Sequence, residues 1–161
     1  MIKCKVETVT FDELSQMGVV ILTEIEGDRV LPIWIGLFEA QAILFRLQNS
    51  FFPRPLTHDL LKNCLEKLGG KTARIIISKV EQSTYHAEIV IIAYGKEIKI
   101  DSRPSDAIAL AVRAQVPILV DNKVMDENGI KRDEFVKEQK EKIYKKYLET
   151  FEEEDSGKLK H

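Results

Sequence analysis

Residues 101–106, Asp-Ser-Arg-Pro-Ser-Asp, place a basic side chain between two carboxylates where a predicted strand enters a predicted helix at residues 107–114. A helix N-terminus presents unpaired N–H groups that favour an anion. Arg103 and this helix end are therefore expected to hold a phosphate, with Asp101 or Asp106 on a divalent cation. A structural interpretation is also open, because a serine cap, a proline and an acidic residue are ordinary features of a first helical turn.

A second group of polar side chains occupies residues 51–59, Phe-Phe-Pro-Arg-Pro-Leu-Thr-His-Asp. Two prolines bracket Arg54, and His58 and Asp59 fall in the first turn of a predicted helix. The His-Asp pair resembles that of metal phosphohydrolases, but those sites need further histidine ligands and the whole sequence has three histidines. Asp59 also suits a first turn without any chemistry, because the helix dipole favours an acidic side chain there.

The elements that must position these residues are related by an internal repeat. With a shift of 67 residues, residues 18–48 align without a gap over residues 85–115. Both segments contain two β-rich runs joined by a short turn and followed by a helical stretch. The repeat places Glu39 opposite Asp106, each at the start of its helix, so approximate two-fold symmetry is expected to bring both carboxylates to one rim.

The same residues have a structural alternative. Carboxylates and arginines of the two halves would form buried ion pairs, and such pairs often fix geometry without taking part in chemistry. Arg46 and Arg113, at equivalent positions of the two predicted helices, suit that structural role.

Helical and extended patterns predict the rest of the chain. A helix over residues 57–68, with Thr57 as its N-cap, carries an apolar face of Leu61, Cys64, Leu65 and Leu68, which predicts a buried Cys64. Trp34 and Phe38, where a strand gives way to a helix, are predicted to pack in the interior. Further strands are predicted at residues 6–11, 73–80 and 116–120, and a turn at residues 126–129.

Residues 131–161 mix acidic and basic side chains in equal number around an apolar stripe, which predicts one long amphipathic helix with a frayed tail from Glu152. Packing against the body or a neighbour is one use of the stripe, and docking of a partner protein is the other. The stripe consists of Val136, Ile143, Tyr144, Tyr147, Leu148 and Phe151.

Composition excludes several classes of protein. The 161 residues carry a formal net charge of −2, so no global basic field is present for sequence-independent nucleic-acid binding. No apolar run approaches the ~20 residues of a membrane span, and the N-terminus lacks a signal-peptide core, which predicts a cytoplasmic protein without a membrane partner. Cys4 and Cys64 are isolated, which argues against structural zinc and disulfides. Abundant Ile, Glu and Lys with little Asn resemble thermophile composition.

Three ordered blocks of residues resemble the signature of the bifunctional nuclease domain family, over roughly residues 1–130. The first runs from Leu31 to Gly36 and continues with Glu39-Ala40, the second covers residues 54–60, and the third covers residues 101–110. The resemblance implies a nuclease, since plant members of the family act on both DNA and RNA.

The family blocks fall on eight polar residues here, to which we assign roles. The expected catalytic residues are His58, Asp59, Asp101 and Asp106; the substrate-binding residues are Arg54, Arg103 and Ser105; and the ligands of a Mg²⁺ or Mn²⁺ ion are Glu39, Asp101 and Asp106. His58 would serve as general acid or base, because an imidazole titrates near neutral pH.

Together these patterns predict an α+β fold in which a duplicated hairpin–helix unit forms a curved, mostly antiparallel sheet. Residues 1–130 form the nuclease-like domain and residues 131–161 the C-terminal helix. The predicted function is divalent-metal-dependent hydrolysis of phosphodiester bonds in RNA or DNA. The alternative is a non-enzymatic dimeric scaffold or regulator that binds an anionic ligand or partner protein at the same rim. A homodimer is expected in either case, because a small core and an amphipathic terminal helix leave apolar surface to bury.

Overall fold

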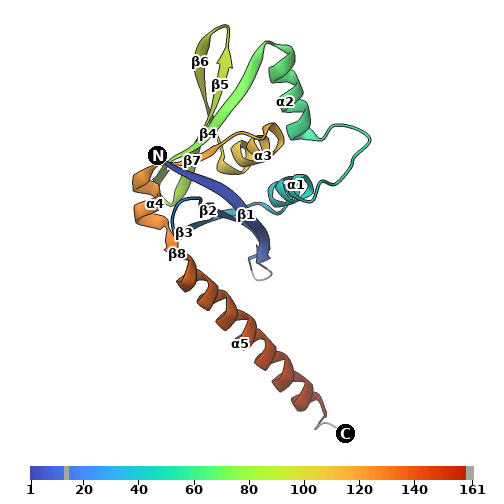
Figure 1. Cartoon of the computed structure of the whole chain (residues 1–161). Coiled ribbons are helices and arrows are strands. Elements are labelled where there is room, and N and C mark those ends of the chain that lie inside the picture. Colours follow the sequence, from blue (N-terminus) through green and yellow to red (C-terminus); the bar gives the residue numbers. More distant parts are fainter. Residues whose placement is uncertain (13–14, 159–161) are drawn as a thin grey trace. The chain divides into compact units, whose positions relative to one another are not determined.

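A computed structural model describes residues 1–12 and 15–158 of the chain, and the side chains of residues 146–158 are outside the description (Figure 1). The chain divides into two compact units, residues 1–129 and 130–161. In the described part of the first unit, one sheet has the strand order β6-β5-β4-β7-β1-β2-β3. Only β4 and β7 pair in parallel; the other neighbours are antiparallel. The predicted α+β class with a mostly antiparallel sheet is confirmed.

Two segments of the first unit repeat the order hairpin then helix. The first comprises β2 (Met17–Glu24), β3 (Arg29–Ile35) and α1 (Leu37–Leu47), and the second comprises β5 (Thr84–Ala93), β6 (Lys96–Ser102) and α3 (Pro104–Ala114). A shift of 67 residues carries the bounds of β3 onto those of β6 and the bounds of α1 onto those of α3. The repeated order of elements agrees with the pattern in the sequence, while their common origin stays a prediction.

The other described elements of the first unit are β1 (Ile2–Asp12), α2 (Thr57–Lys67), β4 (Gly70–Glu81), β7 (Ile118–Val120) and α4 (Asn122–Asn128). In the sheet, β4, β7 and β1 lie between the two hairpins. Register shifts in β1 and β4 mark bulges, which bend a strand and increase its twist.

One face of the sheet forms the core with α1 and α3. Alternate side chains of each strand point to this face, and the buried set includes Leu22, Ile33, Ile77, Ile89 and Leu110. Close packing requires a glycine at one point: a Cβ on Gly18 would overlap the Cβ of Ala40, which is fully buried in α1. The contact fixes the height of α1 above β2, and hence the position of the residues at the start of this helix.

Helix α2 differs from its prediction in two respects. Its N-cap is Leu56 rather than Thr57, and the capping contact comes from the Asp59 carboxylate, which accepts a hydrogen bond from the Leu56 N–H at 3.0 Å. The predicted apolar face is also largely uncovered. Cys64 is exposed, so the prediction of a core thiol was wrong, and Leu68 is 73% exposed.

Three further predictions of local structure were wrong. Trp34 and Phe38, expected in the interior, are 52% and 79% exposed. Trp34 follows the buried Ile33 on the strand, so its side chain points to the opposite face of the sheet. The turn expected at residues 126–129 is the end of α4, which begins with the Asp121 side chain accepting a hydrogen bond from the Lys123 N–H.

The second unit consists of β8 (Ile130–Lys131) and α5 (Arg132–Lys158). The predicted long helix is present, and within the described residues it runs to Lys158, past Glu152 where fraying was expected to begin. Val136, Ile143 and Tyr144 of the predicted stripe are exposed, while the side chains of Tyr147, Leu148 and Phe151 lie outside the described residues. Among the described residues, no helix is long and apolar enough to cross a membrane.

Candidate functional site

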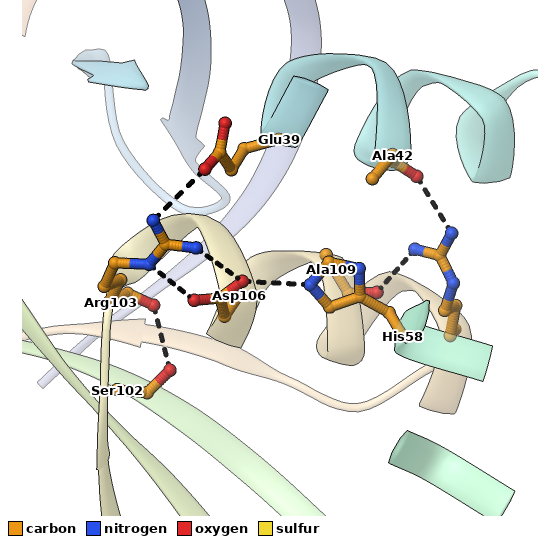
Figure 2. Close-up of polar contacts among 8 residues, drawn as sticks. Glu39, Ala42, His58, Ser102, Arg103, Asp106 and Ala109 are labelled. Carbon is orange, nitrogen blue, oxygen red and sulfur yellow. Dashed lines mark hydrogen bonds and ion pairs between the residues drawn. The ribbon is translucent and has the colours of Figure 1, made fainter. Parts of the chain in front are cut away.

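Arg103 joins the first turns of two helices (Figure 2). It is the N-cap residue of α3, directly after β6 ends, with Pro104 in the first helical position. Its guanidinium pairs with both carboxylate oxygens of Asp106, through Nε to Oδ2 at 2.7 Å and through Nη2 to Oδ1 at 3.2 Å. Nη1 donates to Glu39 Oε1 of α1 at 3.1 Å. The side chain of Arg103 nevertheless stays 65% exposed, so its outer edge is open to a ligand.

The repeat explains how two carboxylates reach one arginine. Glu39 and Asp106 are each the third residue of their helix, and the N-cap residues before them are Gly36 and Arg103. The Glu39 carboxylate folds back over Gly36, into the space that a Cβ would occupy there. The expectation that Glu39 and Asp106 meet at one rim agrees with this geometry, with Arg103 between them.

His58 extends the cluster from α2. Its Nε2 lies 3.0 Å from Asp106 Oδ1, and 12% of its side chain is exposed. Partial burial by itself raises the pKa of Asp106, but hydrogen bonds and charge from Arg103 and His58 outweigh that effect and hold the pKa below its ordinary value. An ionised carboxylate only accepts hydrogen bonds, so the proton of a neutral His58 belongs on Nε2 and the lone pair on Nδ1.

Asp59, the neighbour of His58, is engaged in structural contacts. Its Oδ1 pairs with Arg113 Nε at 2.8 Å, while its other oxygen caps α2. Arg113 is almost fully buried and also donates to the carbonyl oxygens of Ala109 and Ala42. The structural role predicted for Arg113 agrees with these contacts.

Three other predicted site residues lie apart from this cluster. Asp101 is exposed on β6 and pairs in register with Glu88, so it projects from the sheet face opposite to the one covered by α1 and α3. Arg54 is exposed in the segment before α2. Ser105 is only 5% exposed, within the first turn of α3. The structure thus brings together Glu39, His58, Arg103 and Asp106, which we call the Arg103 cluster.

The carboxylates as arranged do not fit a divalent cation. Among the described residues, no group of three or more His, Cys, Asp or Glu side chains is placed to bind a metal ion. Two of the three predicted ligands pair with Arg103, and Asp101 lies on the other face of the sheet. The guanidinium therefore stands where the cation was expected, and the dependence on Mg²⁺ or Mn²⁺ stays a prediction.

Sequence reasoning missed the part that Gly36 plays in the site, which is to make room for the Glu39 carboxylate. The 67-residue shift carried a signal for it, since it aligns Gly36 with Arg103. Arg113 was given a structural role but not its partner, and it anchors the start of α2 beside His58. No pattern in the sequence links Arg113 to Asp59.

Known proteins with similar sequences point to one family. The family model described as the bifunctional nuclease domain matches residues 20–133. An uncharacterised protein of Mycobacterium tuberculosis is 36% identical over 126 residues, which cover 78% of this chain and 75% of that protein. Bifunctional nuclease 2 of Oryza sativa subsp. japonica is 30% identical over 123 residues, covering 74% of this chain and 38% of the rice protein. Bifunctional nuclease 2 of Arabidopsis thaliana is 27% identical over 105 residues, covering 63% and 32%.

The matched residues span most of the first unit, which is an α+β domain with one mostly antiparallel sheet. The chain belongs to the bifunctional nuclease domain family.

Proposed function

We propose that this protein hydrolyses phosphodiester bonds of RNA, DNA or both, and that the Arg103 cluster is the reaction site. The observation that carries the proposal is the hydrogen-bonded series Arg103, Asp106, His58, which ends in an exposed cation on one side and a proton-accepting imidazole on the other. Family membership supports it, since the matched rice and Arabidopsis proteins are named bifunctional nucleases.

Arg103 supplies the phosphate contact. Its guanidinium has five N–H donors, of which the ion pairs with Glu39 and Asp106 use three, so two remain for phosphate oxygens. The N-termini of α1 and α3 meet at the same place, and neither N-cap residue has a side chain that accepts a hydrogen bond from a backbone N–H of its helix. Free backbone N–H groups of both helices add to the attraction for an anion.

His58 moves the proton. Its Nδ1 accepts the proton of the attacking oxygen, which is that of water or, in RNA, the adjacent 2′-hydroxyl, as this oxygen bonds to phosphorus. The P–O bond to the leaving oxygen breaks in the same displacement, and the leaving oxygen takes up a proton from solvent. Asp106 holds the ring in the tautomer that this step needs and stabilises the imidazolium that forms, as the carboxylate does in hydrolase triads. Glu39 acts as a positioning residue, because it touches Arg103 rather than the space beside the imidazole.

A requirement for Mg²⁺ or Mn²⁺ is a separate proposal. It rests on the acidic residues that the sequence gathers at this rim; since Arg103 pairs with Glu39 and Asp106 as they stand, the ion would arrive with the nucleic acid and not occupy a site formed in advance. A divalent ion bound with the nucleic acid would supply Lewis-acid stabilisation of the phosphate charge.

Cleavage of end-labelled single-stranded RNA and DNA tests the proposal, with Mg²⁺, Mn²⁺ or EDTA in parallel. His58→Gln and Asp106→Asn are expected to lower the cleavage rate about a hundredfold or more. Glu81→Gln is the matched control, because it neutralises the carboxylate of a comparable ion pair, Lys79–Glu81 at 2.8 Å, at the turn between β4 and β5. Undiminished cleavage by both site variants would refute the reaction site, and loss of wild-type cleavage in EDTA would support the metal requirement.

The alternative function is a non-enzymatic module that binds an anionic ligand or partner at the same rim. One observation favours it: Arg103 is already paired with two carboxylates, and a guanidinium held in place in this way can bind an anionic ligand without any reaction. A fluorescently labelled oligonucleotide provides the assay, because its anisotropy rises when it binds the protein. Binding that is lost in Arg103→Ala and is unaccompanied by cleavage would establish the module and exclude the enzyme.

A further inference from the structure

Strand β6 presents an open edge. Among the strands of residues 1–12 and 15–129 it pairs only with β5, so one row of its backbone N–H and C=O groups is without a strand partner. The first six residues of β6 are all exposed. Exposed edges of this kind are templates for pairing with another strand unless a protein blocks them with proline, a bulge or a covering element. Strand β6 has no proline, and its register with β5 is regular throughout.

Apolar side chains accompany this edge. Ile98 and Ile100 point to the helix-covered face of the sheet, yet they remain 44% and 42% exposed. Tyr94, in the turn that leads into β6, is 86% exposed and donates from its hydroxyl to the carbonyl oxygen of Leu68 at 3.0 Å. Leu68 at the end of α2 is itself 73% exposed. We call these four residues and the β6 backbone the β6 edge surface; an exposed apolar surface with a polar rim is typical of a protein interface.

We infer that the β6 edge surface binds a second copy of this chain, with β6 pairing antiparallel to β6 of the partner subunit. A strand that pairs antiparallel with itself forms an isologous contact, which closes as a two-fold dimer and leaves no β6 edge open. Side chains that face each other across such a pair must come from the same face of the sheet. The registers allowed by this rule differ in which charges they bring together.

The register centred on Ile98 is favoured by charge. It places Ile98 opposite Ile98 of the partner subunit, and Glu97 opposite Lys99 of the partner subunit, twice by symmetry. Within one subunit Glu97 already pairs with Arg74 at 2.7 Å, and Lys99 pairs with Glu88 at 3.0 Å. The two pairs therefore join into a series of alternating charge across the interface, and opposite charges on facing positions stabilise a sheet.

The neighbouring registers are less suitable. Centring the pair on Lys99 sets Lys99 against itself and Glu97 against Asp101, so like charges face each other at all these positions. Centring it on Ile100 moves the overlap away from Tyr94 and Leu68, which would stay exposed. The register centred on Ile98 alone combines complementary charge with cover for the apolar residues.

Sedimentation velocity over a dilution series tests the inference. The wild-type chain of 18.4 kDa is expected to sediment with twice that mass. Lys99→Glu is expected to raise the dimer dissociation constant about tenfold or more, because it creates two repulsive pairs with Glu97. The double variant Glu97→Lys/Lys99→Glu exchanges the charges and is expected to restore the dimer. Lys79→Glu makes the same charge change at the turn between β4 and β5 and is expected to leave the mass unchanged.

Disulfide cross-linking determines the register of the β6 pair, and it does not need a variant that destabilises the dimer. In a Cys64→Ser background, Ile98→Cys is expected to form an intermolecular disulfide on oxidation, because facing residues of an antiparallel pair are within disulfide range. Ile100→Cys is expected to form no intermolecular disulfide, since its own copy lies about 13 Å away along the strands. A monomeric wild type, a dimer that Lys99→Glu does not weaken, or cross-linking at Ile100 instead of Ile98 would overturn the inference.

Discussion

Arg113 is the side chain whose replacement tests the architecture of the site most directly. Only 3% of it is exposed, and its guanidinium reaches groups on three helices: the carbonyl oxygen of Ala109 in α3 at 2.9 Å, that of Ala42 in α1 at 3.0 Å, and Asp59 in α2 at 2.8 Å. Arg46 occupies the equivalent position in α1, but its contact is a single long hydrogen bond of 3.4 Å to Val112. The repeat therefore provides a matched pair of arginines with very different surroundings.

The substitution Arg113→Lys keeps the positive charge and removes the planar fork. An ammonium group on one stem cannot replace three contacts that diverge toward three helices, so two of them are expected to be lost. A hydrogen bond that involves a charged group contributes about 1.5–3 kcal/mol, but Asp59 is 38% exposed and water will replace part of its contact. We therefore expect the free energy of unfolding to fall by about 2–4 kcal/mol, against less than about 0.5 kcal/mol for Arg46→Lys.

Urea denaturation followed by far-UV circular dichroism measures both variants. A fall of that size moves the midpoint to lower urea while the slope stays unchanged, because the surface exposed on unfolding is the same. The cleavage rate of Arg113→Lys should fall as well, since Asp59 and His58 share the first turn of α2. Equal losses of stability in Arg113→Lys and Arg46→Lys would refute the reasoning that the three-helix contact holds α2 in place.

Three further predictions concern packing, pH and thiol reactivity. Gly18→Ala is expected to lower the free energy of unfolding by about 1–3 kcal/mol in the same denaturation assay, because the new Cβ meets the buried surface of α1. Gly27→Ala is the control: its Cβ meets only a flexible side chain, so the free energy of unfolding should fall by less than about 1 kcal/mol. The pKa of Asp106 is depressed, so its contribution to stability is complete above the ordinary pKa near 3.9 and is lost as the pH falls through the folded value; the stability difference between wild type and Asp106→Asn should therefore shrink below about pH 4. Burial, and secondarily nearby negative charge, raises the pKa of the Cys4 thiol to about 11. Iodoacetamide at pH 8 should therefore modify only the exposed Cys64 in native protein and both thiols in denaturant, and the intact mass gives the number of modified thiols.

Local patterns in the sequence predicted the strands and helices of the first unit well where burial of one face makes apolar residues recur at a fixed spacing. The 67-residue shift aligned two hairpin–helix segments whose observed bounds agree residue by residue for β3 with β6 and for α1 with α3. The pattern failed where an apolar face has no partner within the chain. Periodicity shows that α2 has such a face, but whether Leu61 and Leu68 are buried depends on what lies against them, and that is a property of the tertiary and quaternary structure.

The site was predictable in its residue types and only partly in its geometry. Glu39 and Asp106 were expected to meet because the repeat makes their positions equivalent, and they do. Asp101 was grouped with them because it is near in sequence, although strand alternation already sets its side chain on the face opposite to that of Ser102. The contact of His58 with Asp106 joins residues 48 positions apart, so it follows from the docking of α2 against α3, which no local pattern specifies.

The two halves of the repeat differ in the residue that begins each helix, and this difference makes the cluster asymmetric. Both helices carry an acidic third residue, but α1 begins at Gly36 and α3 begins at Arg103. Arginine at both N-caps would compete for the same two carboxylates, and glycine at both would leave the carboxylates facing each other with no cation between them, which like-charge repulsion disfavours. With one arginine the cluster is stable and its guanidinium edge stays open. His58 contacts Asp106 and not Glu39, so the proposed proton acceptor lies on one side of the cluster only, and under the proposed function a bound phosphate would be attacked from that side.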